Sequence, residues 1–474
     1  MPNTPYLTAP IATTKMPPGI PYIIGNEAAE RFSFYGMRTI LVVFMTRFLL
    51  DSHGNDKFMT NEEAKYYYHL FVASAYFFPV LGAILSDVWL GKYPTIISLS
   101  LVYCLGHAAL AVDDTRMGLF AGLALIAIGA GGIKPCVSAH VGDQFGKSNA
   151  HLLERVYGWF YFSINFGSFF STILTPWLLE ECPKWLIKHF GVVSPEAISK
   201  LQRLGPHLAF GVPGLLMLIA TIVFWIGRYK FAHIPPRGIK EVALALRGEG
   251  SLALLKLVPI FIFVAMFWSL YDQTGSAWVL QADQMDRTWL RHEWLSSQIQ
   301  AINPLLILVL MPFFSYVGYP AINKVFRLTP LRKMSVGLFL TVAAFTISSI
   351  AQEQIDAGKT PNIVWQLAAY VVITASEVMV SITGLEFSYT QAPRELKSVV
   401  MSMWLLTVSL GNVFTMFVNK FIQNPDGSVK LAGAAYFWFF TILMFGAAVL
   451  FIVVAWLYRE KTYIQEERPA TTVG

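Results

Sequence analysis

The sequence predicts an all-α membrane protein whose twelve transmembrane helices form two bundles of six. Of its 474 residues, 55% are hydrophobic and only 14% are charged, and the mean hydropathy is +0.53. This composition is typical of integral membrane proteins. Apolar runs of about 20 residues, the length that a helix needs to cross a bilayer, recur along the chain. The runs lack the two-residue alternation of barrel strands, so helices are the expected spanning elements.

The twelve runs fall into two groups of six. A polar linker at residues 231–251 contains a Pro-Pro pair and separates the groups, as expected for a transporter whose two bundles rock about a central site. The predicted units are a tail at 1–20, a bundle at 21–230, the linker at 231–251, a bundle at 252–460 and a tail at 461–474. The predicted spans cover residues 22–50, 66–90, 95–112, 117–140, 153–179, 207–230, 252–282, 297–319, 331–352, 363–387, 397–422 and 433–458.

Basic residues predict the orientation in the membrane. Lysine and arginine are more frequent in the tails and the even-to-odd loops than in the loops on the other side, which places both termini in the cytoplasm by the positive-inside rule. The basic pI of 9.0 therefore reflects topology and not nucleic-acid binding. The first nineteen residues contain five prolines and no apolar core of signal-peptide length, so we expect a short tail that is not cleaved.

Cysteine usage and motif content argue against an enzyme. Cys104, Cys136 and Cys182 are far apart and odd in number, which predicts neither a disulfide framework nor a metal site. The sequence contains no nucleotide-binding glycine loop, metal-ligand cluster or appended soluble domain. We therefore expect no catalytic residues, no metal and no cofactor.

Four charges in the first span need an explanation, because a charge near the centre of a transmembrane helix costs roughly 2.5 to 3.5 kcal/mol even on the lenient insertion scale. Glu27, Arg31, Tyr35 and Arg38 are spaced by four, four and three residues. They lie along one helical face, with Glu30 at its edge. Mutual neutralisation of Glu27 and Arg31 is a structural alternative, but it leaves Glu30 and Arg38 unexplained. This face is expected to line an interior site.

The segment "GAILSDVWLGKY" at residues 82–93 connects the second and third spans. It resembles a loop motif of the major facilitator superfamily. Gly82 would allow close helix approach, and Asp87 and Lys92 could form charge pairs that lock one conformation. The structural alternative is a solvated turn at the end of a helix.

Further charges lie in spans of both halves. Lys134 follows the small residues GAGG and precedes Pro135, where glycines admit another helix or a ligand and proline invites a bend. Lys134 serves a cavity or extends to the cytoplasmic surface. Asp272 and Glu377 are acids within apolar spans, which is unfavourable unless they are paired or protonated. Lys134 with Glu377, and Arg38 with Asp272, are the expected pairs between the halves.

Several other polar positions have both a functional and a structural interpretation. His69 and Tyr76 are seven residues apart and share a face of the second span; a histidine there could modulate proton movement or make a structural hydrogen bond. Asn165 and Asn303 are amides for which a helix-packing bond is the common role. Trp268 lies one turn before the acid of its span, and Ser381 lies one turn after Glu377.

Together these segments resemble the proton-coupled oligopeptide transporter family, the peptide transporter branch of the major facilitator superfamily. The resemblance extends in the family's order over residues 27–400. The matching segments are "EAAERF" with "SFYG", "GGIKPCVSAHVGDQF", "FYFSINFGS", "FWSLYDQTGSAW" and "TGLEFSYTQAPRELKSVV".

The resemblance implies roles for these residues. It implies that Glu27, Glu30 and Arg31 couple protons, that Arg31 also binds the peptide carboxylate, and that Glu377 receives the peptide amino group. His69 matches a histidine of animal-type members for which a proton role is argued. The same comparison makes Arg38–Asp272 the outer gate and places Lys134–Glu377 across the cavity. The other implied substrate-binding positions are Tyr35, Arg38, Tyr76, Lys134, Asn165, Trp268, Asn303, Ser381 and Trp404.

The expected function is proton-driven import of di- and tripeptides, with peptide-like drugs as possible further substrates. The chain lacks the helix pair that many bacterial members insert between the halves and the extracellular domain of animal members. We therefore expect a multi-pass protein of a bacterial inner (plasma) membrane that functions as a monomer. A symporter for another anion such as nitrate is the alternative within transport, and a non-transporting sensor or membrane enzyme is the alternative outside it.

Overall fold

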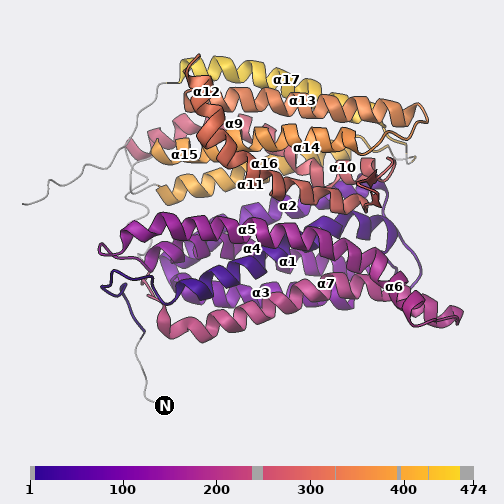
Figure 1. Cartoon of the computed structure of the whole chain (residues 1–474), viewed down its shortest axis with the longest axis horizontal. Coiled ribbons are helices and arrows are strands. Elements are labelled where there is room, and N and C mark those ends of the chain that lie inside the picture. The colour runs from indigo at the N-terminus through magenta and orange to yellow at the C-terminus, as the bar shows by residue number, and fades with distance from the viewer. Residues whose placement is uncertain are drawn as a thin grey trace, which may run out of the picture.

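The protein folds into two helical bundles that lie side by side (Figure 1). The computed structural model describes residues 6–236, 249–325, 327–391, 397–424, 426 and 428–458. One buried hydrophobic cluster gathers residues of 20–231, joined by Val279 and Val408, and a second gathers residues of 257–451. The predicted unit boundaries stay a prediction. Much of the predicted linker and the predicted C-terminal tail lie outside the described residues.

The first half supplies the helices drawn in indigo to magenta in Figure 1. All six predicted spans of this half correspond to a long helix. The elements are α1 (Ile20–Arg47), α2 (Asn61–Ile84) with the π-helical turn η1 (Leu85–Leu90), α3 (Lys92–Val112), α4 (Arg116–Asp143), η2 (Ala150–Leu152), α5 (Leu153–Pro176) with η3 (Trp177–Glu181), α6 (Cys182–His189), and α7 (Pro195–Ile226) with η4 (Gly227–Lys230).

The second half forms the other layer, and several of its spans are interrupted. They are broken at Asp272, around residue 314 and after Glu377. The elements are α9 (Glu249–Tyr271), η5 (Asp272–Gly275), α10 (Ala277–Ala282), β1 (Thr288–Trp289), β2 (His292–Glu293), η6 (Ser296–Ala301), α11 (Ile302–Phe313), η7 (Phe314–Gly318), α12 (Tyr319–Asn323), α13 (Pro330–Asp356), α14 (Val364–Glu377), η8 (Val378–Ile382), α15 (Thr383–Thr390), α16 (Lys397–Phe421) and α17 (Ala434–Leu457).

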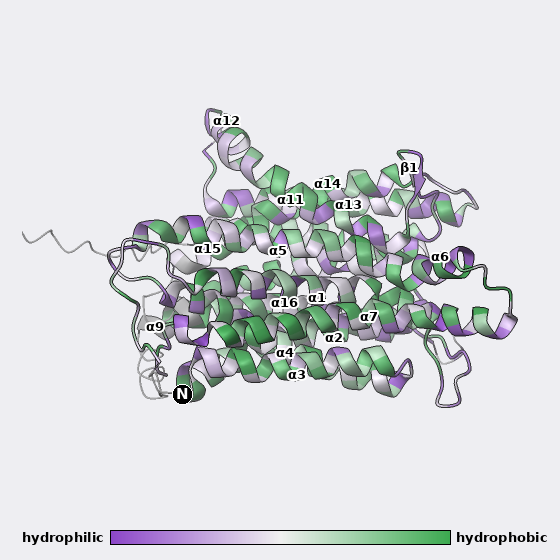
Figure 2. Cartoon of the chain, turned by 60° about the horizontal axis from the view of Figure 1, so that its bottom comes forward, coloured by the Kyte–Doolittle hydropathy of each residue, from purple (hydrophilic) through white to green (hydrophobic). Residues whose placement is uncertain are grey.

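Ten helices of the described chain are long and apolar enough to cross a membrane. The other two predicted spans are α1, which carries four charges in its interior, and α5, which is rich in Ser, Thr, Asn and Tyr. Most of α1 is buried, and it lies against α5 and α7. Helix α5 exposes Phe162, Phe166 and Phe170 on its outer face. Apolar segments dominate the middle of the long helices and polar segments gather toward their ends (Figure 2). This is the distribution expected of a chain that spans a bilayer.

The structure departs from the predicted spans between α5 and α7. Helix α7 begins at Pro195, twelve residues before the predicted start, because Ser194, Pro195 and Glu196 supply a helix-start signal that an apolar window does not register. The short helix α6 precedes it and was not predicted. At about 1.5 Å per residue, a helix as long as α7 extends beyond the bilayer.

Close helix contact at Gly82 follows the prediction from the motif. A Cβ atom at Gly82 would collide with the backbone of Gly132, so α2 and α4 touch through two glycines. Such contact is open only to residues without a side chain. It fixes α2 beside the segment of α4 that carries Lys134.

We call the end of the molecule with Leu7, Lys92 and Phe231 the linker side, and the end with Arg47 and Asp283 the far side. On the linker side Leu7 forms a parallel bridge with Ala232, and its carbonyl accepts a hydrogen bond from the His233 amide at 2.6 Å. The start of the linker is therefore held against the first bundle.

Candidate functional site

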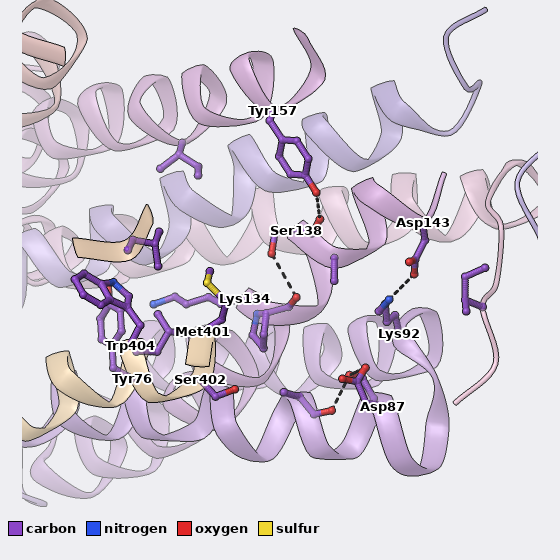
Figure 3. A pocket seen from close by; sticks show the side chains of 18 of the residues that line it. Tyr76, Asp87, Lys92, Lys134, Ser138, Asp143, Tyr157, Met401, Ser402 and Trp404 are labelled. Atoms are coloured by element: carbon purple, nitrogen blue, oxygen red, sulfur yellow. Dashed lines mark hydrogen bonds and ion pairs between the residues drawn. The ribbon is translucent and has the colours of Figure 1, made fainter. Parts of the chain in front are cut away.

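A cavity of about 760 Å³ lies between the two bundles and reaches the linker side (Figure 3). Its wall joins α1, α2, α4 and α5 of the first half to α15 and α16 of the second. Its size is in the range of small-molecule binding sites. The predicted site residues that line it are Arg31, Tyr35, Tyr76, Lys134 and Trp404.

Helix α1 brings the predicted proton-coupling charges together. The Nε atom of Arg31 lies 2.6 Å from Oε1 of Glu27 and 3.0 Å from Oε2 of Glu30. Only the contact with Glu27 has hydrogen-bond geometry, and both Glu30 oxygens lack a hydrogen-bond partner among the described residues. All three side chains are buried. One cation thus faces two acids, of which Glu30 is the less satisfied.

Lys134 projects into the cavity from α4. Its Nζ lies 3.8 Å from the centre of the Phe34 ring and 4.1 Å from that of Tyr76. Nζ has no hydrogen-bond partner among the described residues. The ammonium is therefore held over aromatic faces and remains available to a ligand, and it does not extend to the surface as in the alternative interpretation.

Glu377 lies in the second half at the end of α14, directly before the π-helical turn η8. Its Oε2 accepts hydrogen bonds from the Tyr271 hydroxyl at 2.8 Å and from Asn303 Nδ2 at 2.9 Å. In the described chain no partner occupies Oε1. Glu377 acts electrostatically on Tyr35 and Tyr161 of the first half, so its carboxylate faces the opposite wall.

The predicted pair between Lys134 and Glu377 is absent in this conformation. Lys134 contacts aromatic rings, and Glu377 is held by Tyr271 and Asn303. The prediction of an ion pair between them is wrong for this state of the molecule. Lys134 contacts aromatic rings of the first half, and Glu377 accepts hydrogen bonds from residues of the second half.

Arg38 and Asp272 form the predicted ion pair between the halves, through Nη2 and Oδ1. Arg38 Nε also donates to the Tyr68 hydroxyl at 2.7 Å, and Asn412 Nδ2 donates to Asp272 Oδ2 at 2.6 Å. Asp272 begins η5, where α9 is interrupted. The pair lies beyond the cavity toward the far side, so it closes this side while the linker side is open.

His69 belongs to the same buried network. Its Nδ1 lies 2.6 Å from Asn412 Oδ1, and its Nε2 lies 2.9 Å from Ser276 Oγ. Because Asn412 donates its amide to the carboxylate of Asp272, its oxygen is left to accept from His69 Nδ1–H. His69 is therefore linked to the carboxylate of Asp272 through the side chain of Asn412. These contacts are compatible with a structural hydrogen bond and with a role in proton movement.

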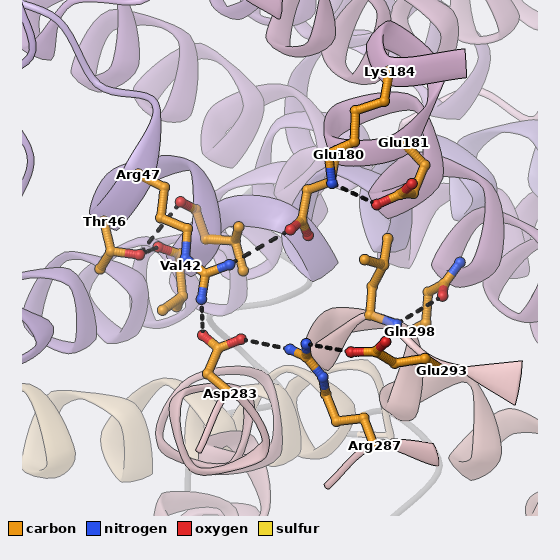
Figure 4. A network of polar contacts seen from close by, with 12 residues as sticks. Val42, Thr46, Arg47, Glu180, Glu181, Lys184, Asp283, Arg287, Glu293 and Gln298 are labelled. Carbon is orange, nitrogen blue, oxygen red and sulfur yellow. Dashed lines mark hydrogen bonds and ion pairs between the residues drawn. The ribbon is translucent and has the colours of Figure 1, made fainter. Parts of the chain in front are cut away.

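A second polar network closes the far side nearer the surface (Figure 4). Arg47 of α1 pairs with Asp283 of the second half at 2.6 Å and with Glu180 of the first at 3.5 Å. Arg287 contacts Asp283 at 3.2 Å and Glu293 at 3.4 Å. Arg47 is partly exposed, so this network contributes less to closure than the buried pair.

One of the two charged residues of the loop motif, Lys92, forms an ion pair. Lys92 Nζ lies 2.6 Å from Asp143 Oδ2 at the end of α4, while Asp87 accepts only a 3.4 Å hydrogen bond from Ser86. Lys92 thus ties α3 to α4 at the mouth of the cavity (Figure 3). The prediction that Lys92 is a charge-pairing residue holds, and its partner is Asp143.

Of the remaining predicted residues, Trp404 lines the cavity, whereas Asn165, Trp268 and Ser381 are not among the residues that line it. Asn165 donates to the Tyr161 carbonyl at 3.0 Å, which is a bond within α5. Trp268 packs against both hydrophobic clusters, and its Nε1 has no partner among the described residues. Ser381 lies in η8, and Trp404 packs edge-on against Phe261.

Three residues of these networks escaped the sequence analysis. Asn412 joins Asp272 to His69, Tyr68 binds Arg38, and Tyr271 binds Glu377. A buried amide in the middle of an apolar span was a usable signal for Asn412. Tyrosines are common in these spans, so nothing in the sequence distinguished the other two.

Two helical bundles with a cavity between them that reaches the linker side, joined on the far side by ion pairs, are the arrangement of a secondary transporter. The family model described as the POT family matches residues 93–246 and 245–439. The chain belongs to the POT family.

Relatives and solved structures agree with this family. Solute carrier family 15 member 1 of Homo sapiens is 37% identical over 394 residues, which cover 72% of this chain and 52% of that protein. Peptide transporter 3 of Caenorhabditis elegans is 36% identical over 385 residues, with 72% and 51% covered. A crystal structure of an auto-inhibited POT family peptide transporter is 36% identical and has a TM-score of 0.81 over 95% of this chain and 99% of that one.

The chain spans about half the length of the curated relatives that it matches. The match to the solved POT structure confirms the predicted all-α membrane fold of the major facilitator type. The Caenorhabditis elegans relative and the solved structure are both named as peptide transporters.

Proposed function

We propose that this chain is a proton-coupled symporter that imports di- and tripeptides by alternating access. The observation that carries the proposal is the charge arrangement of the cavity. Arg31 and Lys134 line the cavity. Glu377 of the other half is not among the lining residues, but it acts electrostatically on Tyr35, which lines the cavity, and its Oε1 is free of partners in the described chain. A short peptide has a carboxylate at one end and an ammonium at the other.

Such a cavity recognises the ends of a peptide and leaves its side chains unspecified. The carboxylate would meet Arg31 and Lys134, and the ammonium would meet Glu377 Oε1. Charge-assisted hydrogen bonds of this kind are about twice as strong as neutral ones. Tyr35 and Trp404 line the same cavity and would contact varied side chains without demanding particular bonds. The expected substrates are short zwitterions, including peptide-like drugs.

Proton coupling would use the acids beside Arg31. Protonation of Glu27 or Glu30 removes one ion pair of Arg31 and frees the guanidinium for a peptide carboxylate. A proton that moves down the membrane potential contributes about 2.3 kcal/mol per 100 mV, enough for roughly fortyfold accumulation of peptide. His69 would add a second titratable group at the far-side gate through Asn412. Protons are the only coupling ion in this scheme, and no cofactor takes part.

The gates would act in turn. The present conformation is open on the linker side and closed on the far side by Arg38–Asp272. Closure of the linker side would bring the two walls together and allow Lys134 and Glu377 to pair across the emptied cavity. We place the linker side in the cytoplasm of a bacterial inner membrane, with both termini there, and we propose a functional monomer.

The deciding experiment for substrate class is uptake of a labelled dipeptide into proteoliposomes under an inward pH gradient. Unlabelled di- and tripeptides should compete, and tetrapeptides, sugars and nitrate should not. Competition by nitrate as strong as that by dipeptides would overturn the proposal in favour of an anion symporter. A pH gradient without effect on uptake would exclude proton coupling.

A further inference from the structure

Five buried polar side chains on α1 and α3 of the first bundle contain atoms that have no hydrogen-bond partner among the described residues. They are Asn26 and Glu30 of α1 and Ser100, Tyr103 and His107 of α3. Each is at most 1% exposed. Buried polar groups in proteins nearly always have a partner, either protein or ordered water. Five in one region point to a ligand that supplies the missing bonds.

The five side chains form two sets inside the bundle, one on α1 and one on α3. Asn26 and Glu30 are four residues apart on α1, and Ser100, Tyr103 and His107 follow at three and four residues on α3, so each set shares one helical face. The rings of Tyr103 and His107 lie 5.0 Å apart. Glu30 lies near enough to the Tyr103 hydroxyl to act on it electrostatically, which relates the α1 set to the α3 set. We call these five residues the polar ladder.

Charged groups act on two members of the ladder, Glu30 and Tyr103. Glu30 interacts with Arg31, Glu27 and Lys134, and Tyr103 interacts with Glu30, Arg31, Glu27 and Cys104. No charged group acts on His107, whose neighbour is the Phe210 backbone carbonyl outside hydrogen-bond geometry. The part of the ladder around His107 is therefore a neutral polar region inside an apolar bundle.

The ladder leads toward the far side along the seam of α3 and α7. Gly214 of α7 packs directly on the Cβ atom of His107. One turn further along α3, the Ala111 carbonyl accepts a 2.7 Å hydrogen bond from Nδ1 of the half-exposed His207. Nε2 of His207 lies 3.6 Å from Asp114, whose Oδ1 has no partner among the described residues. A titratable pair thus stands at the far-side end of the seam.

We propose that the polar ladder binds a chain of water molecules that carries protons from the far side to Glu30. Buried waters typically make about three hydrogen bonds to polar groups that lack other partners. Amide, hydroxyl and imidazole groups can both donate and accept, and the Glu30 carboxylate accepts. The ladder offers this mixture of groups along roughly 10 Å of α3, from Ser100 to His107. The proposal rests on the proton-coupled function above and supplies the route for its proton.

The proton step is balanced within the ladder. A hydronium ion at the far-side end gives its proton to the next water, and the transfer repeats until a proton bonds to Glu30 and a neutral water is left beside it. During each proton transfer, Tyr103 and His107 accept one hydrogen bond and donate another, so the protonation state of both side chains is unchanged afterwards. Protonated Glu30 no longer balances Arg31, which then turns its charge toward the cavity.

Arg31 also limits leakage. It lines the cavity, and Glu30 lies behind it. A fixed positive charge at the end of a water chain repels an excess proton, as in channels that exclude protons. Protons would therefore reach Glu30 from the ladder and pass to the cavity only when Arg31 has a peptide carboxylate as partner.

The first test is direct observation of water. A density map of the full chain at about 2 Å resolution or better should show ordered water near the Tyr103 hydroxyl and the His107 ring. The expected distance is that of a hydrogen bond, about 2.5 to 3.2 Å. Direct pairing of these side chains with each other, or a seam filled by apolar atoms, would overturn the proposal. This result does not depend on transport activity.

The second test separates the ladder from the cavity. Tyr103→Phe keeps the ring and removes its hydroxyl, and His107→Phe keeps an aromatic side chain and removes both ring nitrogens. We expect pH-gradient-driven dipeptide uptake to fall about tenfold, which corresponds to about 1.4 kcal/mol, the upper range for one lost neutral hydrogen bond, while dipeptide counterflow stays near wild type. Thr221→Val is the control, because it removes a buried hydroxyl of the same bundle that already bonds to the Met217 carbonyl at 2.8 Å.

The outcomes distinguish the two proposals. A wild-type protein that responds to the gradient, with both ring variants equal to the Thr221 control, would refute the ladder and leave the proposed function standing. Equal losses of gradient-driven uptake and counterflow would make Tyr103 and His107 structural, which also refutes the ladder. A wild-type protein that ignores the gradient would refute proton coupling, and the density map alone would then decide the ladder.

Discussion

Replacement of Asp272 by asparagine should open the far side of the transporter. Asp272 is 1% exposed and holds Arg38 through one oxygen and Asn412 through the other. Asp272→Asn keeps the shape of the side chain but removes its charge, which leaves the buried Arg38 guanidinium without a counter-ion. When the gate opens, Arg38 and the side chain at position 272 are hydrated. The substitution therefore destabilises the closed state more than the open state.

The size of the effect follows from the burial of the pair. Removing one partner of a buried ion pair costs about 3 to 5 kcal/mol. We take about 3 kcal/mol, because the asparagine oxygen still accepts one hydrogen bond. At about 1.4 kcal/mol per tenfold change, the ratio of closed to open far side should fall roughly 150-fold. The open state should therefore gain population relative to the closed state by the same factor.

Spin labels on the far side measure this change. Cysteines at the exposed positions His53 and Leu290, one in each half, are labelled in a variant that lacks the three native cysteines. Pulsed electron paramagnetic resonance should show a shift to longer distances in Asp272→Asn. Glu196→Gln, which breaks an exposed pair with Lys200 on α7, should leave the distances unchanged. Identical distances in Asp272→Asn and the wild type would refute the gate assignment.

Three further substitutions test the binding wall and the fold. Glu377→Gln should weaken transport of a dipeptide with a free amino group far more than that of an N-acetylated one, and equal loss in competition assays would contradict the amino-group assignment. Tyr271→Phe removes the 2.8 Å hydrogen bond to Glu377 and should raise the half-saturating dipeptide concentration roughly tenfold; an unchanged value would show that the bond does not orient the acid. Gly82→Ala should destabilise the fold by about 1 to 3 kcal/mol through collision with the α4 backbone, whereas Gly25→Ala, with open space around it, should melt like the wild type.

The spans and the charged face of α1 could be predicted because each rests on a local pattern. Apolar runs of the right length identify the helices, and spacings of three and four residues place Glu27, Arg31 and Arg38 on one face. The Arg38–Asp272 pair was also predictable, since two opposite charges buried in different halves have few other partners. These features depend on residues within one helix or on the scarcity of buried charge.

Features that depend on conformation could not be predicted from the sequence. Whether Lys134 meets Glu377 or the Phe34 ring depends on which end of the cavity is open. The pairing of Lys92 with Asp143 depends on the position of the start of α3 relative to the end of α4. The sequence also does not show which buried polar side chains of the first bundle lack a hydrogen-bond partner. A histidine such as His107 looks the same in the sequence whether or not it has one.

The central claim is that peptide and proton move together through the site around Arg31. Its most direct test is a single vesicle preparation in which labelled dipeptide uptake and internal acidification are followed at the same time. We predict that adding dipeptide to wild-type vesicles without an imposed gradient acidifies the interior in step with uptake. Glu27→Gln with Glu30→Gln should abolish the acidification while dipeptide counterflow continues. Dipeptide uptake by the wild type without any acidification would contradict the account.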